Sequence, residues 1–167
     1  LNLLKTGCCI LDVGGESTRP GAREVTSSEE IERVVGIIKK IKKYSPSAII
    51  SIDTRKAIVA DKALQAGASI VNDISGGSFD EKMLDVVAKY NAVVCLMHSK
   101  GLPENMQDEP HYENVMLDIY DYLKKKVTEA ESKGISREKI MIDPGIGFGK
   151  SFSHNLEIIK KVTLFLG

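Results

Sequence analysis

Five short apolar segments alternate with segments of helical periodicity along this 167-residue chain, and no other feature limits its possible folds as strongly. The apolar segments cover residues 8–13, 48–52, 69–74, 92–97 and 139–142. The helical segments cover residues 28–44, 55–65, 80–90, 112–133 and 154–166. Alternation of this kind is typical of parallel sheets joined by right-handed crossovers, and continuously apolar strands indicate that both sheet faces are covered. The sequence therefore predicts an α/β fold.

Two parallel architectures fit this alternation: an open doubly wound sheet and a (β/α)8 barrel. A complete barrel usually needs about 250 residues, so this chain would supply about five of its eight units. Residues 1–6, followed by Gly7, resemble the end of a helix, and the last helical segment is not followed by a strand. We interpret residues 1–167 as one partial barrel domain.

Composition and charge argue against several classes of partner. The 23 basic residues balance the 23 acidic ones, so no net field attracts nucleic acid or an anionic membrane. No apolar run approaches the roughly 20 residues that a membrane span requires, and the N-terminus does not resemble a signal peptide. Three cysteines (Cys8, Cys9 and Cys95) do not indicate a disulfide framework, and we expect the first two to be buried strand residues. These features predict a protein of the reducing cytoplasm.

Polar residues follow each of the five predicted strands. They are Asp12, Asp53, Asn72 with Asp73, His98 after Met97, and Asp143. Because the C-terminal ends of parallel strands share one rim, we expect these side chains to gather where such folds bind ligands. A carboxylate accepts two parallel hydrogen bonds from an amino group and a neighbouring ring N–H. The set therefore matches the 2-amino-4-oxo edge of a pterin or a guanine-like heterocycle, and it also suits a sugar or a hard cation.

A glycine-rich loop, GGESTRPGA at residues 14–22, follows the first predicted strand. Its glycines permit unusual backbone angles and the close approach of a ligand, and Pro20 stiffens its middle. Arg19 lies beside hydroxyl groups and backbone N–H groups, which together suit a phosphate or a carboxylate.

A second glycine-rich loop, DPGIGFGK at residues 143–150, follows the last predicted strand. It does not fit the Walker A pattern, which needs glycine where Pro144 stands, or the dinucleotide pattern, which needs glycine where Lys150 stands. Its alternating glycines suggest instead that a closely approaching backbone holds Phe148 over a flat ligand. Among the histidines, we expect His98 to be hydrogen-bonded and structural.

The segment LDVGGESTRPG at residues 11–21 resembles the second-strand signature of the dihydropteroate synthases. Further segments resemble the third to sixth strand ends of that family, in family order: IDT at 52–54, NDISG at 72–76, LMH at 96–98 and DPGIGFGK at 143–150. The resemblance runs the length of the chain, and its first and last motifs are highly specific. It implies a TIM (β/α)8 barrel of the pterin-binding type, of which roughly strands 2–6 are present.

This resemblance implies a transferase of folate biosynthesis, and a sulfonamide target, that joins 6-hydroxymethyl-7,8-dihydropterin diphosphate to p-aminobenzoate. The catalytic residues would be Asp53, Asp143 and Arg19. The substrate-binding residues would be Thr18, Arg19, Pro20, Asp53, Asn72, Ile74, Met97, Asp143, Gly147 and Phe148. The complete enzyme would be a cytoplasmic homodimer that uses Mg²⁺.

Three parts of the family pattern lie outside this sequence: the first-strand Asn that helps bind Mg²⁺, and the cationic motifs of the seventh and eighth strands. We therefore expect no metal ligand in this chain and little or no synthase activity from the chain alone. A pterin-binding methyltransferase domain is one alternative, although the loop at residues 17–21 argues against it. The other is a non-catalytic pterin-binding remnant.

Overall fold

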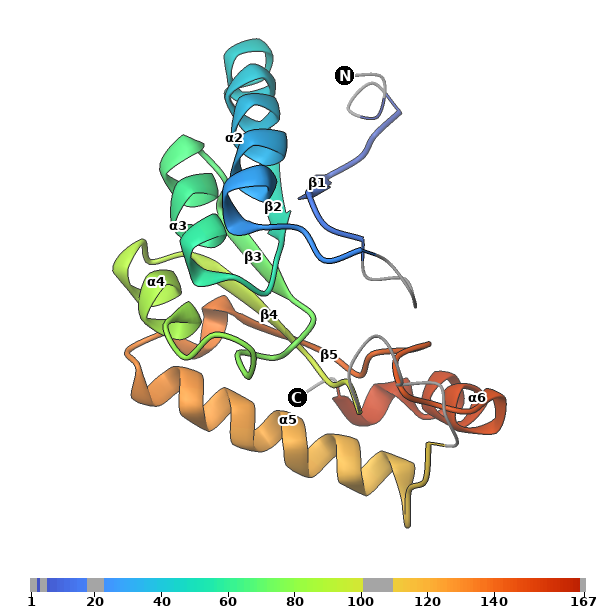
Figure 1. Ribbon diagram of the computed structural model, residues 1–167. Helices are drawn as coiled ribbons and strands as arrows, with labels where there is room; N and C mark the ends of the chain where they lie inside the picture. Colours follow the sequence, from blue (N-terminus) through green and yellow to red (C-terminus); the bar gives the residue numbers. More distant parts are fainter. Residues whose placement is uncertain (1–2, 4–5, 18–22, 101–109, 166–167) are drawn as a thin grey trace.

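The computed structural model describes residues 3, 6–17, 23–100 and 110–165, which contain one parallel sheet with helices packed along it (Figure 1). The strands are β1 (Ile10–Gly14), β2 (Ile49–Asp53), β3 (Ile70–Asp73), β4 (Val93–Met97) and β5 (Ile140–Asp143). The α-helices are α2 (Ser27–Tyr44), α3 (Ala57–Ala66), α4 (Met83–Lys89), α5 (Val115–Ser132) and α6 (Phe152–Lys160). Two short 3-10 helices are η1 (Arg137–Lys139) and η2 (Val162–Phe165). The predicted alternation of strands and helices is confirmed.

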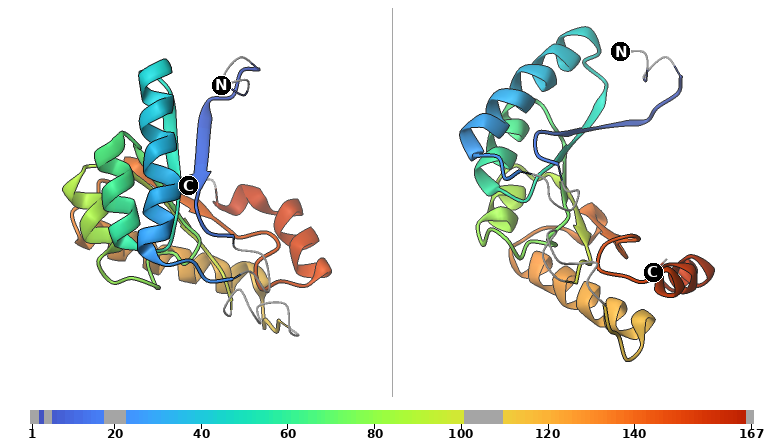
Figure 2. Two further views of the ribbon diagram at one scale, coloured as in Figure 1. Left: turned by 45° about the horizontal axis from the view of Figure 1, so that its top comes forward. Right: turned by 45° about the vertical axis from the view of Figure 1, so that its right-hand side comes forward.

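The order of the strands decides between the two architectures. Each strand pairs in parallel with its neighbour in the sequence, in the order β1-β2-β3-β4-β5. A doubly wound sheet would reverse its order at a switch point, and this sheet has no reversal. The helices α2, α3, α4 and α5 follow the convex side of a curved sheet (Figure 2). This is an incomplete (β/α)8 barrel.

The main core lies between the sheet and the helices on its convex side. Alternate strand residues point toward those helices and are inaccessible to solvent: Ile50, Ile52, Val71, Val94 and Leu96. The concave face differs, since Ile10, Ile49 and Met141 remain 40–46% exposed. The expectation that both faces are covered is therefore wrong for the described residues. When the strand order never reverses, as here, crossovers of a single hand place every connecting helix on the same side of the sheet.

The two ends of the described chain also depart from expectation. The first strand begins at Ile10, so Cys8 and Cys9 precede it, and Cys9 is exposed. The prediction of two buried cysteines is wrong, because β1 lies at the edge of the described sheet with no strand beyond it. The last predicted helix ends early, at Lys160, and continues only as the 3-10 helix η2. None of the helices in the described part of the chain has the length and apolarity that a membrane span requires.

Gly36 offers a direct test of how backbone entropy affects the stability of α2. This glycine is exposed in the middle of the helix, and a Cβ added there would meet no atom within 4 Å. Gly36→Ala should therefore raise the free energy of unfolding by about 0.5–1 kcal/mol, because alanine loses less backbone entropy in a helix. Urea denaturation followed by circular dichroism measures this change. Gly67→Ala should destabilise the fold instead, since Gly67 has a φ of +117° and lies against Lys42.

Candidate active site at the C-terminal rim of the sheet

The strand ends bring four of the predicted polar residues to one rim on the concave face. Gly14 lies opposite Asp53 and Asp53 lies opposite Asn72 in the parallel register, while Met97 lies opposite Asp143. Since side chains alternate along a strand and Ile52, Val71 and Leu96 are buried in the core, the rim residues point to the other face. They are Asp12, Asp53, Asn72 and Asp143.

Asn72 links two of these strands directly. Its side-chain nitrogen donates a hydrogen bond to the carboxylate of Asp12 across the concave face, at 3.4 Å. Asp12 and Asn72 come from β1 and β3, on either side of β2 and its Asp53. The predicted gathering of polar strand ends is therefore confirmed for these positions.

Asp73 points away from this group. It is completely buried on the convex side, where its carboxylate accepts hydrogen bonds from the Ser75 amide (2.8 Å), the Ser75 hydroxyl (2.7 Å) and the Gly77 amide (2.9 Å). Burial raises the pKa of Asp73, although those three donors oppose the rise. This carboxylate stabilises the turn after β3 and does not line the rim.

Asp53 lies near other carboxylate groups, which repel its negative charge. Burial raises its pKa to about 7, and repulsion from Asp12, Glu30, Asp73 and Glu16 contributes in that order. The carboxyl group is therefore close to half protonated at neutral pH. A ligand that offers N–H donors or develops positive charge will favour the ionised form of Asp53. Its donors or its charge offset the burial and the repulsion from neighbouring carboxylates.

Asp143 is held at the end of β5 by its own loop. Its Oδ1 accepts a hydrogen bond from the Gly145 amide at 2.7 Å, and its backbone oxygen accepts one from the His98 amide at 2.9 Å. The carboxyl group therefore has a fixed orientation beside the end of β4, where Met97 is 3% exposed.

The glycines of the loop after β5 serve a purpose that the sequence did not suggest. A Cβ at Gly145 would overlap the backbone oxygen of His98, and one at Gly149 would overlap that of Lys100. A Cβ at Gly147 would meet no atom within 4 Å. At Gly145 and Gly149 this backbone therefore approaches the segment after β4, whereas Gly147 borders open space. Phe148, between the last two glycines, is half-buried, and its contact with a ligand stays a prediction.

Lys150 links the loop after β5 to the end of β4 by hydrogen bonds. Its ammonium group donates to Phe148 O (2.8 Å) and His98 O (3.2 Å) and lies 3.1 Å from His98 Nδ1. Burial lowers the pKa of Lys150 to about 8, opposed by the charge of Asp143. Burial and the nearby Lys150 charge lower the pKa of His98 to about 4, so this ring is neutral at pH 7. The structural role predicted for His98 is confirmed.

The remaining predicted residues divide into two groups. Ile74 is half-buried just beyond β3, and Gly147 is exposed in the loop after β5. Thr18, Arg19 and Pro20 lie outside the described residues.

A buried charged cluster behind Asp53 was missed by the sequence analysis. Glu30 of α2 and Lys56 of the β2–α3 connection form an ion pair of 2.7 Å, and Glu16 lies 3.3 Å from the same lysine. Burial acts to raise the pKa of Glu16, but the Val25 amide and Lys56 outweigh it, and the pKa is lowered. Glu30 and Lys56 are 26 residues apart, so no local pattern could have revealed the pair.

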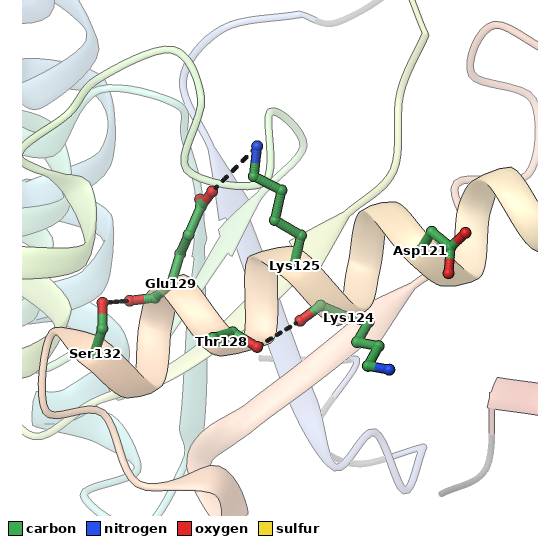
Figure 3. A pocket seen from close by; sticks show the side chains of 6 residues that line it. All are labelled: Asp121, Lys124, Lys125, Thr128, Glu129 and Ser132. Atoms are coloured by element: carbon green, nitrogen blue, oxygen red, sulfur yellow. Dashed lines mark hydrogen bonds and ion pairs between the residues drawn. The ribbon is translucent and has the colours of Figure 1, made fainter.

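A hollow of about 430 Å³ on α5 lies away from this rim (Figure 3). It is lined by Asp121, Lys124, Lys125, Thr128, Glu129 and Ser132. Two of its polar groups are occupied within the helix, since Thr128 donates to Lys124 O (3.1 Å) and Ser132 donates to Glu129 O (2.6 Å). All six residues belong to one helix, so the rim remains the better candidate site.

Comparisons with known proteins show what this chain is similar to. A family model described as pterin binding enzyme matches residues 1–166. The dihydropteroate synthase of Clostridium beijerinckii is 46% identical over 160 residues, which cover 96% of this chain and 56% of that protein. The Escherichia coli dihydropteroate synthase is 39% identical over 163 residues, which cover 98% of this chain and 57% of that protein. The chain thus spans a little over half the length of these relatives.

Solved structures of dihydropteroate synthases are also similar to this chain. A Yersinia pestis dihydropteroate synthase in a sulfonamide drug complex superposes with a TM-score of 0.94 at 37% identity, covering 98% of this chain and 58% of that one. A Clostridium difficile dihydropteroate synthase, solved in the presence of pteroic acid, has a TM-score of 0.90 at 42% identity and covers 98% and 59%.

Proposed function

This chain belongs to the pterin-binding enzyme family, and we propose that it supplies the pterin-binding part of a dihydropteroate synthase. The proposal concerns a complete enzyme, because the chain spans 56–57% of the length of its curated relatives. The observation that carries it is the rim itself, where Asp53, Asn72 and Asp143 end adjacent or near-adjacent parallel strands on the concave face.

The rim matches one edge of a pterin. Asp143, held in orientation by Gly145, would accept hydrogen bonds from the 2-amino group and the neighbouring ring N–H. Asp53 and Asn72 would bind the rest of the polar edge. The apolar faces of the ring would lie among Ile74, Met97, Gly147 and Phe148.

The reaction needs no covalent enzyme intermediate. The nitrogen of p-aminobenzoate attacks the exocyclic methylene carbon, the C–O bond to diphosphate breaks, and diphosphate leaves with the bonding electrons. The attacking nitrogen then loses a proton. Positive charge that develops on the methylene carbon and the ring would be stabilised by Asp53 and Asp143, whose orientation is set before the reaction. Thr18, Arg19 and Pro20 would bind the diphosphate and the arylamine.

Several further features of the complete enzyme belong to the proposal and rest on family membership. They are a place in folate biosynthesis, a requirement for Mg²⁺, a homodimeric state and a cytoplasmic location. Within the described part of the chain, no three His, Cys, Asp or Glu side chains are grouped so that they could hold a metal ion.

Isothermal titration of this chain with 6-hydroxymethyl-7,8-dihydropterin diphosphate, with and without a sulfonamide, tests the proposal. We expect the pterin diphosphate to bind, and the sulfonamide to bind only in its presence. Asp143→Asn should weaken pterin binding about 10- to 100-fold, because a charge-assisted hydrogen bond contributes about 1.5–3 kcal/mol. Glu138→Gln, on exposed η1, is the matched control and should leave affinity unchanged.

Other outcomes of this titration favour the two alternatives. Binding of a pterin without any dependence on the diphosphate or the sulfonamide would favour a methyltransferase domain or a non-catalytic remnant. We expect the chain alone to form little or no dihydropteroate in a direct assay. Robust product formation would contradict that expectation.

A further inference from the structure

A buried ionic cluster connects α2 with the residues that follow Asp53. Glu30 is completely buried, and its Oε1 accepts a hydrogen bond from the Thr54 hydroxyl at 2.7 Å. Its Oε2 accepts one from the Lys56 ammonium group at 2.7 Å. Thr54 also accepts a hydrogen bond from the Lys56 amide at 3.2 Å. Because Thr54 directly follows Asp53, this cluster contacts the chain immediately after the end of β2.

The same lysine reaches the connection between β1 and α2. Its ammonium group donates to Val25 O at 2.5 Å and lies 3.3 Å from Glu16 Oε2. Glu16 Oε1 in turn accepts a hydrogen bond from the Val25 amide at 2.9 Å. Glu16 and Val25 stand at the two ends of residues 17–24. Lys56 therefore ties both ends of this connection to the end of β2.

All three ammonium N–H donors of Lys56 have acceptors within the protein: Glu30, Glu16 and Val25 O. The lysine side chain is 9% exposed, and those of Glu30 and Glu16 are 1% and 11% exposed, so solvent screens these charges weakly. A lysine in this position has no donor left for a substrate. Its influence on the site must pass through the groups that it holds.

A buried ion pair is weak evidence for a gain in the free energy of unfolding. Well-packed apolar residues often stabilise a protein as much as a buried ion pair does, whereas buried polar groups can specify one arrangement of the segments that they join. Here the joined segments are the end of β2, the first turns of α2 and both ends of the β1–α2 connection. Glu30 and Glu16 also lie near enough to Asp53 to raise its pKa, so the carboxylates that Lys56 holds are electrostatic neighbours of this carboxyl group.

We propose that Lys56 is a positioning residue of the pterin site, which holds Asp53 in a fixed relation to Glu16 and Val25, the described ends of the β1–α2 connection, so that Asp53 meets the substrate in one position. The proposal rests on the proposed function for the identity of that substrate. The placement of the joined segments by Lys56 does not depend on the ligand.

The test compares Lys56→Met, Lys56→Arg and wild type at a temperature where circular dichroism shows all three folded. Lys56→Met should weaken binding of 6-hydroxymethyl-7,8-dihydropterin diphosphate by about tenfold or more, since small displacements of positioning groups have effects of this size. Amide exchange of Val25 should accelerate by about tenfold, while amides of β3 and β4 keep wild-type rates. Lys56→Arg keeps the charge but replaces a compact ammonium group with a larger planar group, so it should recover both properties only in part, to between the Lys56→Met and wild-type values.

Lys89→Met is the matched control, because it removes an exposed lysine paired with Asp61 on the convex side and should change neither measurement. A folded Lys56→Met with wild-type affinity and wild-type Val25 exchange overturns the proposal. If Lys56→Met does not fold, Lys56→Gln takes its place, since glutamine removes the charge but still offers a polar N–H donor at this buried position. It should accelerate Val25 exchange about threefold or more, and an unchanged rate overturns the proposal. If wild type does not bind the pterin, the proposed function fails, and the exchange rates still decide the role of Lys56.

Discussion

Asp53→Asn should weaken pterin binding by about 100-fold while making the fold more stable above pH 7. The loss of binding follows from the loss of a carboxylate that accepts ligand hydrogen bonds and opposes developing positive charge. The gain in stability follows from the pKa of Asp53, which burial and neighbouring carboxylates raise from 3.8 to about 7. Asp53→Asn should thus show that this carboxyl group strengthens pterin binding but lowers the stability of the fold above pH 7.

The sign of the pH dependence follows from whether the folded or the unfolded state binds the Asp53 proton more tightly. The folded protein binds the Asp53 proton more strongly than the unfolded chain does, so this group favours folding below about pH 4. That contribution is lost as the pH rises through about 7. At about 1.4 kcal/mol per pKa unit, a rise from 3.8 to about 7 corresponds to a loss of about 4 kcal/mol. Asn cannot ionise and avoids it.

Urea denaturation of wild type and Asp53→Asn between pH 4.5 and 8 measures this effect. The difference in unfolding free energy should be small at the acid end and grow steadily in favour of the variant. Asp121→Asn is the control, because Asp121 is exposed on α5 and lies outside the rim. A constant or shrinking difference for Asp53→Asn would show that Asp53 is ionised throughout this range.

Gly145→Ala should lower the free energy of unfolding by about 3–5 kcal/mol. Gly145 has a φ of +69°, and a Cβ there would overlap the backbone oxygen of His98, which cannot move away as a flexible side chain could. Left-handed backbone strain and steric overlap each cost about 1–3 kcal/mol. The same substitution should weaken pterin binding, because the Gly145 amide orients the carboxylate of Asp143.

Gly147→Ala is a control for this substitution within the same loop. Gly147 also has a positive φ, of +86°, but a Cβ there would meet no atom within 4 Å. Only backbone strain remains, so the loss should be about 1–2 kcal/mol. Thermal and urea denaturation of both variants give the comparison. Equal losses would mean that the contact between Gly145 and His98 does not constrain the loop.

The sequence alone was sufficient for the order and type of the elements and for the gathering of polar residues at the rim. Strands and helices were predictable because periodicity depends on near neighbours, as in the buried positions Val34 and Ile38 of α2. The rim was predictable because parallel strands must end on one side, which brought Asp53, Asn72 and Asp143 together. The motifs that contain these residues were also enough to identify the family.

Only the tertiary structure decided which polar groups face a ligand and which ones hold the fold. Asp73 and Asn72 are neighbours in the sequence, yet strand alternation sends Asp73 into the core and leaves Asn72 on the concave face. Lys150 contacts His98 across 52 residues, and Lys56 contacts Glu30 across 26. Contacts at such separations depend on how the strands are ordered and how the sheet curves. Local sequence patterns carry no record of either, so these groups became visible only once the chain was folded.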